Sequence, residues 1–516
     1  MIIADSCWDA RYLMPDAGYW LPSSIQHRAS SIQSTMDYTD QPAAPNSPLQ
    51  PASNTRWIVM GLVAFASASA YLTRYCVSAA NTTIQPELGI DDKQMGWILG
   101  AFSLGYFFFQ VPGGWLGNRF GTRFAFAFIS IVWSLCNVWS GAASAFTALC
   151  ASRFGLGAFQ AGLTPLSAKI LKDWIPQKNH GISSASIGAC MSIGGAFTVW
   201  MSGELLDVGY GWRGIFYAYS LVGIVWAIGF YWFFRTLPQD HASVNAAELE
   251  LIRQSEQSID LDPKPHQPES FADPVIEIHA AEANLYAPPK SKSGVDAAGD
   301  ADETTPNPLL MFSSISMWSL CLTAFFRAAG YAFFVTWFFA FLEYVYGIDK
   351  GEAGLLTSLP LLAVVIGSLS GGVIVDGLLR ITGSKRVSRS GTGMIALTIC
   401  AVLTLASAWT SSAAQLSTVM ALGALFSGIA SPASWATTID LGGKHTAVVM
   451  GTMNMAGCLA GFVLPIFLGN WFDSIKQSGG NWDQVIYLHA AFYFIAAACW
   501  VVINPNRTVF DRRPAA

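Results

Sequence analysis

Charged side chains are scarce in this chain. Of its 516 residues only 12% are Asp, Glu, Lys or Arg, whereas 53% are hydrophobic and 19 are tryptophans. Soluble domains carry about 25% charged residues. The composition therefore excludes an ordinary soluble protein and indicates a polytopic membrane protein in a lipid bilayer. The net charge of −5 offers no basic surface for nucleic acid, so no nucleic-acid partner is expected.

The sequence also lacks the patterns of a metal site, a disulfide framework and an enzyme. Eight of the nine cysteines, all but Cys7, fall in or beside apolar segments without metal-ligand spacing, which is typical of packing residues. No set of His, Cys, Ser and carboxylate residues shows catalytic spacing. We expect neither an enzyme nor a cofactor. The N-terminus has acidic residues and no continuous apolar core, so it does not predict a signal peptide.

Apolar segments long enough to span a bilayer occur in two groups of six. The first group is predicted at residues 57–80, 94–117, 124–144, 146–171, 181–203 and 212–234, and the second at 317–341, 353–378, 391–409, 414–440, 446–471 and 485–503. Between them, residues 236–308 contain 14 acidic residues and four Lys or Arg, which predicts a hydrophilic linker with one short helix near 246–254.

This layout predicts an all-α membrane protein with twelve transmembrane helices in two pseudo-symmetric six-helix bundles, typical of a transporter. The expected parts are a disordered tail at 1–55, bundles at 56–235 and 309–504, the linker at 236–308 and a short tail at 505–516. Small residues spaced four apart are expected to let helices pack closely. They are Ser184, Gly188, Ser192 and Ala196, then Gly367 and Gly371, and Gly457 and Gly461.

Cations of the short loops gather on one predicted side of the membrane. They are Arg119, Arg123, Lys172, Lys178, Arg380, Lys385, Arg386, Arg389, Lys444, Arg507, Arg512 and Arg513. Cytoplasmic loops are enriched in Lys and Arg. We therefore expect both termini and the linker to be cytoplasmic, in a cell (inner) membrane protein.

One arginine stands inside the first predicted span. Arg74 is the only charge in the 24 residues from 57 to 80, and an arginine at the bilayer centre costs roughly 2.5–3.5 kcal/mol on insertion scales. It shares a helix face with Ser67, Tyr71, Ser78 and Asn81. The polar stripe favours a water-filled cavity with Arg74 as an anion ligand; the alternatives are snorkelling to the interface and a structural ion pair.

A glycine-spaced basic loop follows the second span, with the sequence GWLGNRFGTR from Gly114 to Arg123. It resembles the signature of the major facilitator superfamily, and a weaker echo, GGVIVDGLLR, follows the eighth span. The resemblance implies a gating motif made of Gly114, Asn118, Arg119, Gly121, Arg123, Asp376 and Arg380. Asn118 replaces the usual Asp of that family, so we expect a weaker latch there.

Within the superfamily the chain resembles the anion:cation symporters, over residues 73–90, 96–115, 331–342 and a run from 435 to 465. The resemblance implies that Arg74 binds the anion. Proton-coupled members of that family carry acids at the positions aligned with Thr73 and Gln160, which are neutral here. We therefore expect transport to respond little to a proton gradient, and sodium coupling stays open.

In this superfamily the first, fourth, seventh and tenth helices line the cavity. The candidate substrate ligands are Tyr71, Arg74, Ser78, Asn81, Gln160, Thr164, Arg327, Tyr331, Trp337, Ser431, Ser434, Trp435 and Asn454. Arg74 and Arg327 fall in corresponding helices of the two halves and could hold an anion between them. The alternatives are hydroxyls bonded to their own helix backbone, and for Arg327 an acid partner or snorkelling.

The leading functional hypothesis is a monomeric secondary transporter, a symporter of a small organic anion such as a hexuronate or aldonate. Alternating access would move the substrate, with a proton or sodium as the possible coupling ion. Two hypotheses remain beside it. One is an organophosphate:phosphate antiporter of the same superfamily, and the other is a membrane sensor that binds the ligand without transporting it.

Overall fold

The computed structural model describes residues 51–176, 179–260, 308–443 and 446–510, and these residues form helices and connections without a strand. The first tail up to residue 50, linker residues 261–307 and the last six residues of the second tail lie outside them. Within the described ranges, ten helical segments are long and apolar enough to cross a membrane. The remaining two predicted spans correspond to one 29-residue helix and one pair of consecutive shorter helices.

The first half follows the predicted order closely. Its helices are α2 (Thr55–Ala79), α3 (Asn81–Leu88), α4 (Asp92–Phe120), α5 (Thr122–Ala142), α6 (Phe146–Gln160), α7 (Leu163–Trp174), α8 (His180–Asp207) and α9 (Trp212–Phe233). The fourth predicted span is interrupted after Gln160, so that α6 and α7 replace one helix. At this break Gly162 lies directly against Gly113 of α4, where a Cβ on either glycine would meet the other backbone.

The second half repeats the pattern. Its helices are α11 (Ile315–Thr336), α12 (Phe338–Tyr346), α13 (Lys350–Thr382), α14 (Thr392–Ala406), α15 (Ala413–Gly442), α16 (Thr446–Ser478) and α17 (Asp483–Val502). The seventh predicted span is also divided, at Trp337, which separates α11 from α12 and has a buried side chain. The all-α fold with two helical halves is therefore confirmed.

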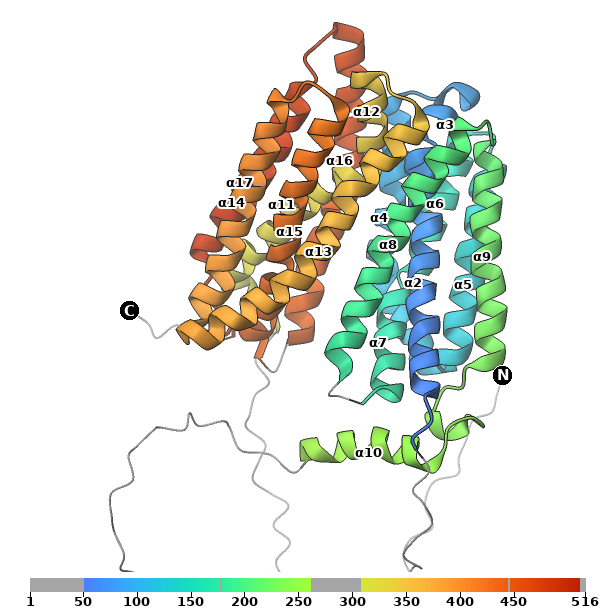
Figure 1. Ribbon diagram of the computed structural model, residues 1–516, viewed down its shortest axis with the longest axis vertical. Helices are drawn as coiled ribbons and strands as arrows, with labels where there is room; N and C mark the ends of the chain where they lie inside the picture. The colour runs from blue at the N-terminus through green and yellow to red at the C-terminus, as the bar shows by residue number, and fades with distance from the viewer. Residues whose placement is uncertain (1–50, 177–178, 261–307, 444–445, 511–516) are drawn as a thin grey trace, which may run out of the picture. The chain divides into compact units, whose positions relative to one another are not determined.

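The halves meet mainly where α4 packs against α16 and α8 against α13, and α2 also contacts α11 and α12. Figure 1 shows α8 beside α13 at the boundary between the halves. Close approach of helix backbones depends on small residues. A Cβ on Gly367 or Gly371 would meet the backbone of α15, and one on Gly461 would meet Ser103 of α4. The prediction of close packing is confirmed at these positions and wrong at Gly188, where an added Cβ would find no atom within 4 Å.

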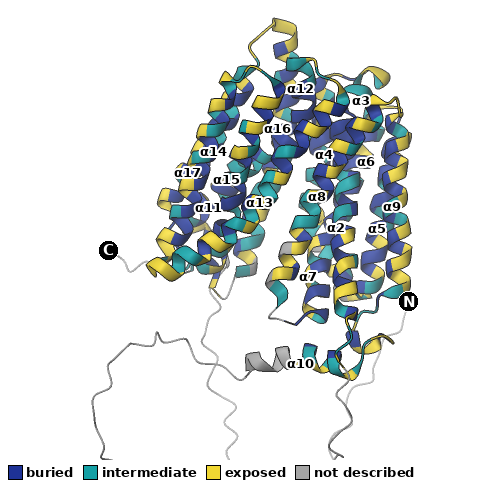
Figure 2. Cartoon of the chain, in the orientation of Figure 1, coloured by how far each residue is buried: buried dark blue, intermediate teal, exposed yellow. Residues whose placement is uncertain are grey.

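Large apolar side chains are exposed along the spanning helices, among them Phe65, Trp232 and Ile366. Figure 2 shows exposed residues along the length of the helices as well as at their ends. In water such a surface would be unfavourable, whereas lipid tails accept it. The exposed surface therefore fits a bundle embedded in a bilayer.

The predicted linker helix is present as α10 (Ala246–Asp260), and its first turn is fixed to the start of α2. The buried carboxylate of Glu248 accepts hydrogen bonds from the backbone N–H groups of Thr55 and Arg56, at 3.3 and 3.0 Å, and pairs with the Arg56 guanidinium at 2.9 Å. The first N–H groups of a helix have no partner within it. Glu248 therefore caps α2 from the linker. We call this end of the molecule the linker side and the opposite end the far side.

Most of the predicted gating motif lies at the linker side. Gly121 joins α4 to α5 with φ of 80°, a conformation that favours glycine, and Arg123 Nε donates to Tyr231 O at 2.9 Å. The exposed residues Arg119, Asp376 and Arg380 form no ion pair within the described ranges. The side chain of Asn118 lies outside what the structure describes, and Gly114 packs against Pro165.

Candidate substrate cavity

A cavity of about 300 Å³ opens between the two halves. Its walls come from α2, α4 and α6 of the first half and from α11, α15 and α16 of the second. The predicted ligands among its lining residues are Tyr71, Arg74, Ser78, Arg327, Tyr331, Trp435 and Asn454. The volume is at the lower end of the range for small-molecule sites, about 300–1,000 Å³, so it suits a small substrate.

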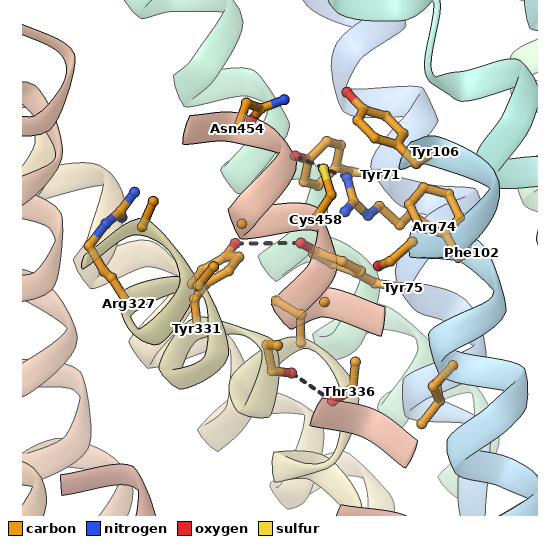
Figure 3. Close-up of a pocket in the computed structure, with 18 of the residues that line it drawn as sticks. Tyr71, Arg74, Tyr75, Phe102, Tyr106, Arg327, Tyr331, Thr336, Asn454 and Cys458 are labelled. Carbon is orange, nitrogen blue, oxygen red and sulfur yellow. Dashed lines mark hydrogen bonds between the residues drawn. The ribbon is translucent and has the colours of Figure 1, made fainter. Parts of the chain in front are cut away.

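Arg74 faces this cavity inside a ring of aromatic side chains (Figure 3). Its guanidinium carbon lies 4.3 Å from the ring centroid of Phe102, 5.2 Å from Tyr71, 5.6 Å from Tyr106 and 5.8 Å from Tyr75. Aromatic faces attract a cation without neutralising it. Arg74 forms no ion pair with a described carboxylate, and among the described residues its side chain makes one hydrogen bond, a long contact to Tyr71 Oη at 3.5 Å. Its positive charge is therefore held in place and left available.

Arg153 on α6 is a second cation in the wall, and it holds the backbone beside Arg74. It is only 2% exposed, and it donates to Thr73 O at 3.0 Å and to Arg74 O at 2.7 Å. Its Nε has no hydrogen-bond partner. Arg153 is not among the candidate ligands chosen from the sequence, although an arginine inside an apolar span is itself a signal.

Gln160, one of the predicted ligands, is turned toward α2 instead of the cavity. Its Nε2 donates to Ala70 O at 3.0 Å and to Thr73 Oγ1 at 2.9 Å. Thr73 Oγ1 in turn donates to Ala70 O at 2.9 Å. This buried contact between α2 and α6 is thus filled by neutral, hydrogen-bonded groups, with no titratable acid.

Arg327 is the cation that the second half contributes. It lies half-buried on α11 and lines the cavity. Within the described ranges its side chain forms neither an ion pair nor a hydrogen bond, and its buried Nε has no partner. One turn later, Tyr331 Oη lies 3.5 Å from Tyr75 Oη of α2. Nearby, Ser78 Oγ donates to Val335 O at 2.6 Å. Figure 3 shows Arg74 and Arg327 on opposite sides of the Tyr75–Tyr331 contact.

The cavity wall carries positive charge without compensation. Arg74, Arg153 and Arg327 line it, and among the described lining residues there is no Asp or Glu. No cluster of His, Cys, Asp or Glu able to hold a metal occurs in the described part of the chain. The polar neighbours are neutral, such as Asn454, whose Nδ2 donates to Gln110 Oε1 at 3.1 Å. The arrangement suits an anion with hydrogen-bonding groups.

The other predicted ligands lie away from the cavity lining. Asn81 is buried and accepts a hydrogen bond from Gln85 Nε2 at 2.9 Å, and Trp337 is buried with its indole N–H donating to Pro465 O at 3.0 Å. Ser434 donates to Ala430 O of its own helix, which is the alternative given above for such hydroxyls. Ser431 is half-buried on the same helix. Thr164 is exposed and contacts Tyr106 Oη at 3.2 Å.

On the far side, a buried carboxylate holds the halves together. Asp92 at the start of α4 is 3% exposed and pairs with Lys476 of α16 at 2.6 Å. Tyr344 of α12 and Gln85 of α3 donate to the same carboxylate at 3.1 and 2.7 Å. Asp92 therefore connects the two halves on the far side of the cavity.

A second far-side cluster lies between α3 and α12. Glu343 accepts a hydrogen bond from Thr82 Oγ1 at 2.7 Å and pairs with Lys350 at 2.9 Å. Polar contacts between the halves are thus found at the level of the cavity and on the far side. On the linker side, the exposed motif residues Arg119 and Asp376 form no ion pair within the described ranges. We infer a conformation closed on the far side.

Known proteins resemble the chain over most of its length. A family model described as Major Facilitator Superfamily matches residues 63–465 and 320–515. A probable sulfoacetate transporter of Cupriavidus necator is 25% identical over 88% of this chain and 95% of that protein. A probable galactarate/D-glucarate transporter of Bacillus subtilis is 26% identical over 81% and 86%. A probable L-galactonate transporter of Escherichia coli is 27% identical over 87% and 91%.

Solved structures show the same fold. A bacterial homolog of the human lysosomal transporter Spinster, in an inward-facing and unoccupied conformation, superposes with a TM-score of 0.61 at 18% identity. The match covers 88% of this chain and 95% of that one. At this level of identity the likeness concerns the fold alone.

Proposed function

This chain belongs to the Major Facilitator Superfamily, and on that premise we propose that it is a secondary transporter of a small organic anion, a sugar acid or a similar acid. The observation that carries the proposal is the uncompensated guanidinium of Arg74 in a cavity between the two halves. A charged group at membrane depth without a partner in the protein is suited to a charged ligand. The chain is a transporter and not an enzyme, because its family and its relatives are transporters.

The chemistry of the wall supports an acid that also carries hydroxyl groups. Arginine offers a planar, bidentate fork to a carboxylate. The hydroxyls of Tyr71, Tyr106 and Tyr331 and the amide of Asn454 provide donors and acceptors around it. The relatives described above are named as transporters of sulfoacetate, galactarate or D-glucarate, and L-galactonate. Their names favour an organic acid over a phosphate ester.

A bound anion that contacts both halves would favour closure of the cavity, and rocking of the halves would then expose it on the other side. We propose that the protein lies in the inner membrane with its linker side facing the cytoplasm, since the cations of the short loops gather on that side. We also propose that the protein works as a monomer. Because Thr73 and Gln160 are neutral and hydrogen-bonded to each other, the coupling does not use a carboxylate at these positions.

Counterflow in proteoliposomes tests the proposal. Labelled D-glucarate or D-galactonate should exchange into vesicles loaded with the same unlabelled acid. Arg74→Ala should abolish this exchange and Arg74→Lys should reduce it, because an ammonium lacks the bidentate fork. Arg253→Ala, at an exposed position of the linker helix, is the matched control and should exchange normally.

Three outcomes would contradict the proposal. Full exchange by Arg74→Ala would remove the role of the guanidinium. Exchange that requires inorganic phosphate would favour the organophosphate antiporter. Saturable binding of an acid without flux in either direction would favour a sensor.

A further inference from the structure

The cavity has two separate cationic ends. Arg74 comes from α2 of the first half and Arg327 from α11 of the second. Figure 3 shows the two side chains on opposite sides of the contact between Tyr75 and Tyr331. Neither arginine pairs with a described carboxylate, and Arg327 has no hydrogen bond to the described part of the protein. Two guanidinium forks are therefore available, one at each end.

Arg153 has a different role from the other two arginines. Both of its terminal nitrogens are engaged by backbone oxygens, at 3.0 Å to Thr73 O and 2.7 Å to Arg74 O. Its side chain is almost fully buried. Arg153 thus fixes the backbone that presents Arg74 and adds its charge to the site, but its fork is already occupied. It is a positioning residue.

The charge of the wall limits which substrate fits well. Three arginines and no described acid give the lining a formal charge of +3. Charge at bilayer depth is unfavourable unless a partner compensates it. A monoanion would leave two positive charges uncompensated, whereas a dianion would leave one. The cavity of about 300 Å³ also restricts the substrate to a short molecule.

We propose that the preferred substrate is a short dianion with an acidic group at each end, one bound by Arg74 and the other by Arg327. This proposal rests on the proposed function and specifies its substrate class as a dicarboxylate or a carboxylate-sulfonate. Arg327 then determines specificity, because it recognises the second acidic group alone. Such a substrate contacts both halves at once, so each end contributes to closing the cavity.

The test compares two acids that differ in one terminal group. D-glucarate and D-gluconate have the same hydroxylated chain, but only the first has two carboxylates. Purified protein in detergent should bind glucarate at least about tenfold more tightly than gluconate, since a charge-assisted hydrogen bond has that order of effect. The measurement is isothermal titration, with counterflow competition as a second readout.

Three variants assign the preference to residues. Arg327→Gln should weaken glucarate binding by about 10- to 100-fold and change gluconate binding by less than about threefold. Arg74→Gln should weaken both acids. Arg327→Lys keeps the charge and should retain part of the preference for glucarate. The preference of the wild-type protein is measured without any variant, so a variant that does not fold leaves the test intact.

Equal affinity of the wild-type protein for the two acids would overturn the inference. So would an Arg327→Gln variant that loses both acids to the same extent while remaining folded. Either result would leave anion transport through Arg74 standing. Failure of the proposed function is distinct, because then neither acid would bind or exchange.

Discussion

The phenolic oxygens of Tyr75 and Tyr331 lie 3.5 Å apart and join α2 of the first half to α11 of the second. Both residues neighbour a cavity arginine in sequence, Tyr75 directly after Arg74 and Tyr331 one turn after Arg327. The contact therefore lies between the two ends of the proposed site. A substrate bound between the two arginines would therefore lie beside a direct contact between the halves.

Replacing Tyr331 with Phe should alter the exchange rate without abolishing it. The variant removes one hydroxyl of a long hydrogen bond, which is worth about 0.5–1.5 kcal/mol, so the change should be less than about tenfold. Counterflow of labelled glucarate measures it. Tyr487→Phe, at an exposed position on α17, is the control and should behave as wild type. An inactive but folded Tyr331→Phe variant would mean that this hydroxyl is essential to transport and contributes far more than one long hydrogen bond.

Gln160→Glu should introduce a pH dependence that the wild-type protein lacks. Gln160 Nε2 donates to Ala70 O and Thr73 Oγ1, and an ionised carboxylate cannot donate there. The new acid would have to take up a proton or move toward Arg153. Counterflow at several values between about pH 5 and 8 should therefore vary more for Gln160→Glu than for wild type or Gln160→Ala. Strong accumulation driven by a pH gradient in the wild type would contradict the expectation.

Asp92→Asn should loosen the far-side closure. Asn keeps an acceptor for Tyr344 and Gln85 but leaves the Lys476 ammonium without its partner at 2.6 Å. Breaking a buried charged contact of this kind costs on the order of 1–3 kcal/mol. Cys458 of the cavity wall reports the change. In a background without the other cysteines, an impermeant thiol reagent added from the far side should label Cys458 faster in Asp92→Asn than in the parent.

The stability of the protein should fall when His241 becomes protonated. His241 lies outside the spanning helices, with its ring 5.7 Å from Trp174 and 4.8 Å from Phe233. Burial lowers the pKa of the imidazole; Arg235 acts in the same direction, whereas Glu248 and the Phe233 backbone oppose it. Because the folded pKa is below the unfolded value of about 6.5, the unfolded state takes up the proton first, and stability falls as the pH drops below that value.

Thermal unfolding in detergent measures this effect. The melting temperature of the wild-type protein should fall between pH 7.5 and 5.5, and that of His241→Phe should fall less, since Phe keeps the aromatic packing and does not titrate. An equal loss in both proteins would show that other groups dominate.

The helical layout was predictable because apolar runs of sufficient length must cross a bilayer as helices. Arg74 was predictable for a related reason, since a lone charge in such a run is conspicuous. The breaks at Gly162 and Trp337 were not, because they depend on contacts with Gly113 and with Pro465 on other helices. A hydrophobicity pattern contains no information on these partners.

Side-chain direction limited the prediction of the site. Gln160 was selected as a candidate ligand, but whether its side chain or that of Arg153 points to the cavity or to α2 depends on carbonyls of a distant segment. Likewise Phe102 and Tyr106 belong to an aromatic-rich helix in which nothing local distinguishes a residue beside Arg74 from one facing lipid. Such contacts appear only once α2 and α4 are placed side by side.

The three arginines of the wall also bear on the transport cycle. Without its cargo, the carrier must close around an uncompensated positive cavity at membrane depth when the halves rock, which a cycle with cargo in both directions avoids. Return of the vacant form should thus be the slow step of turnover. Release of acid from preloaded vesicles should speed up when the same acid is present in the outside medium, as in an obligatory exchanger.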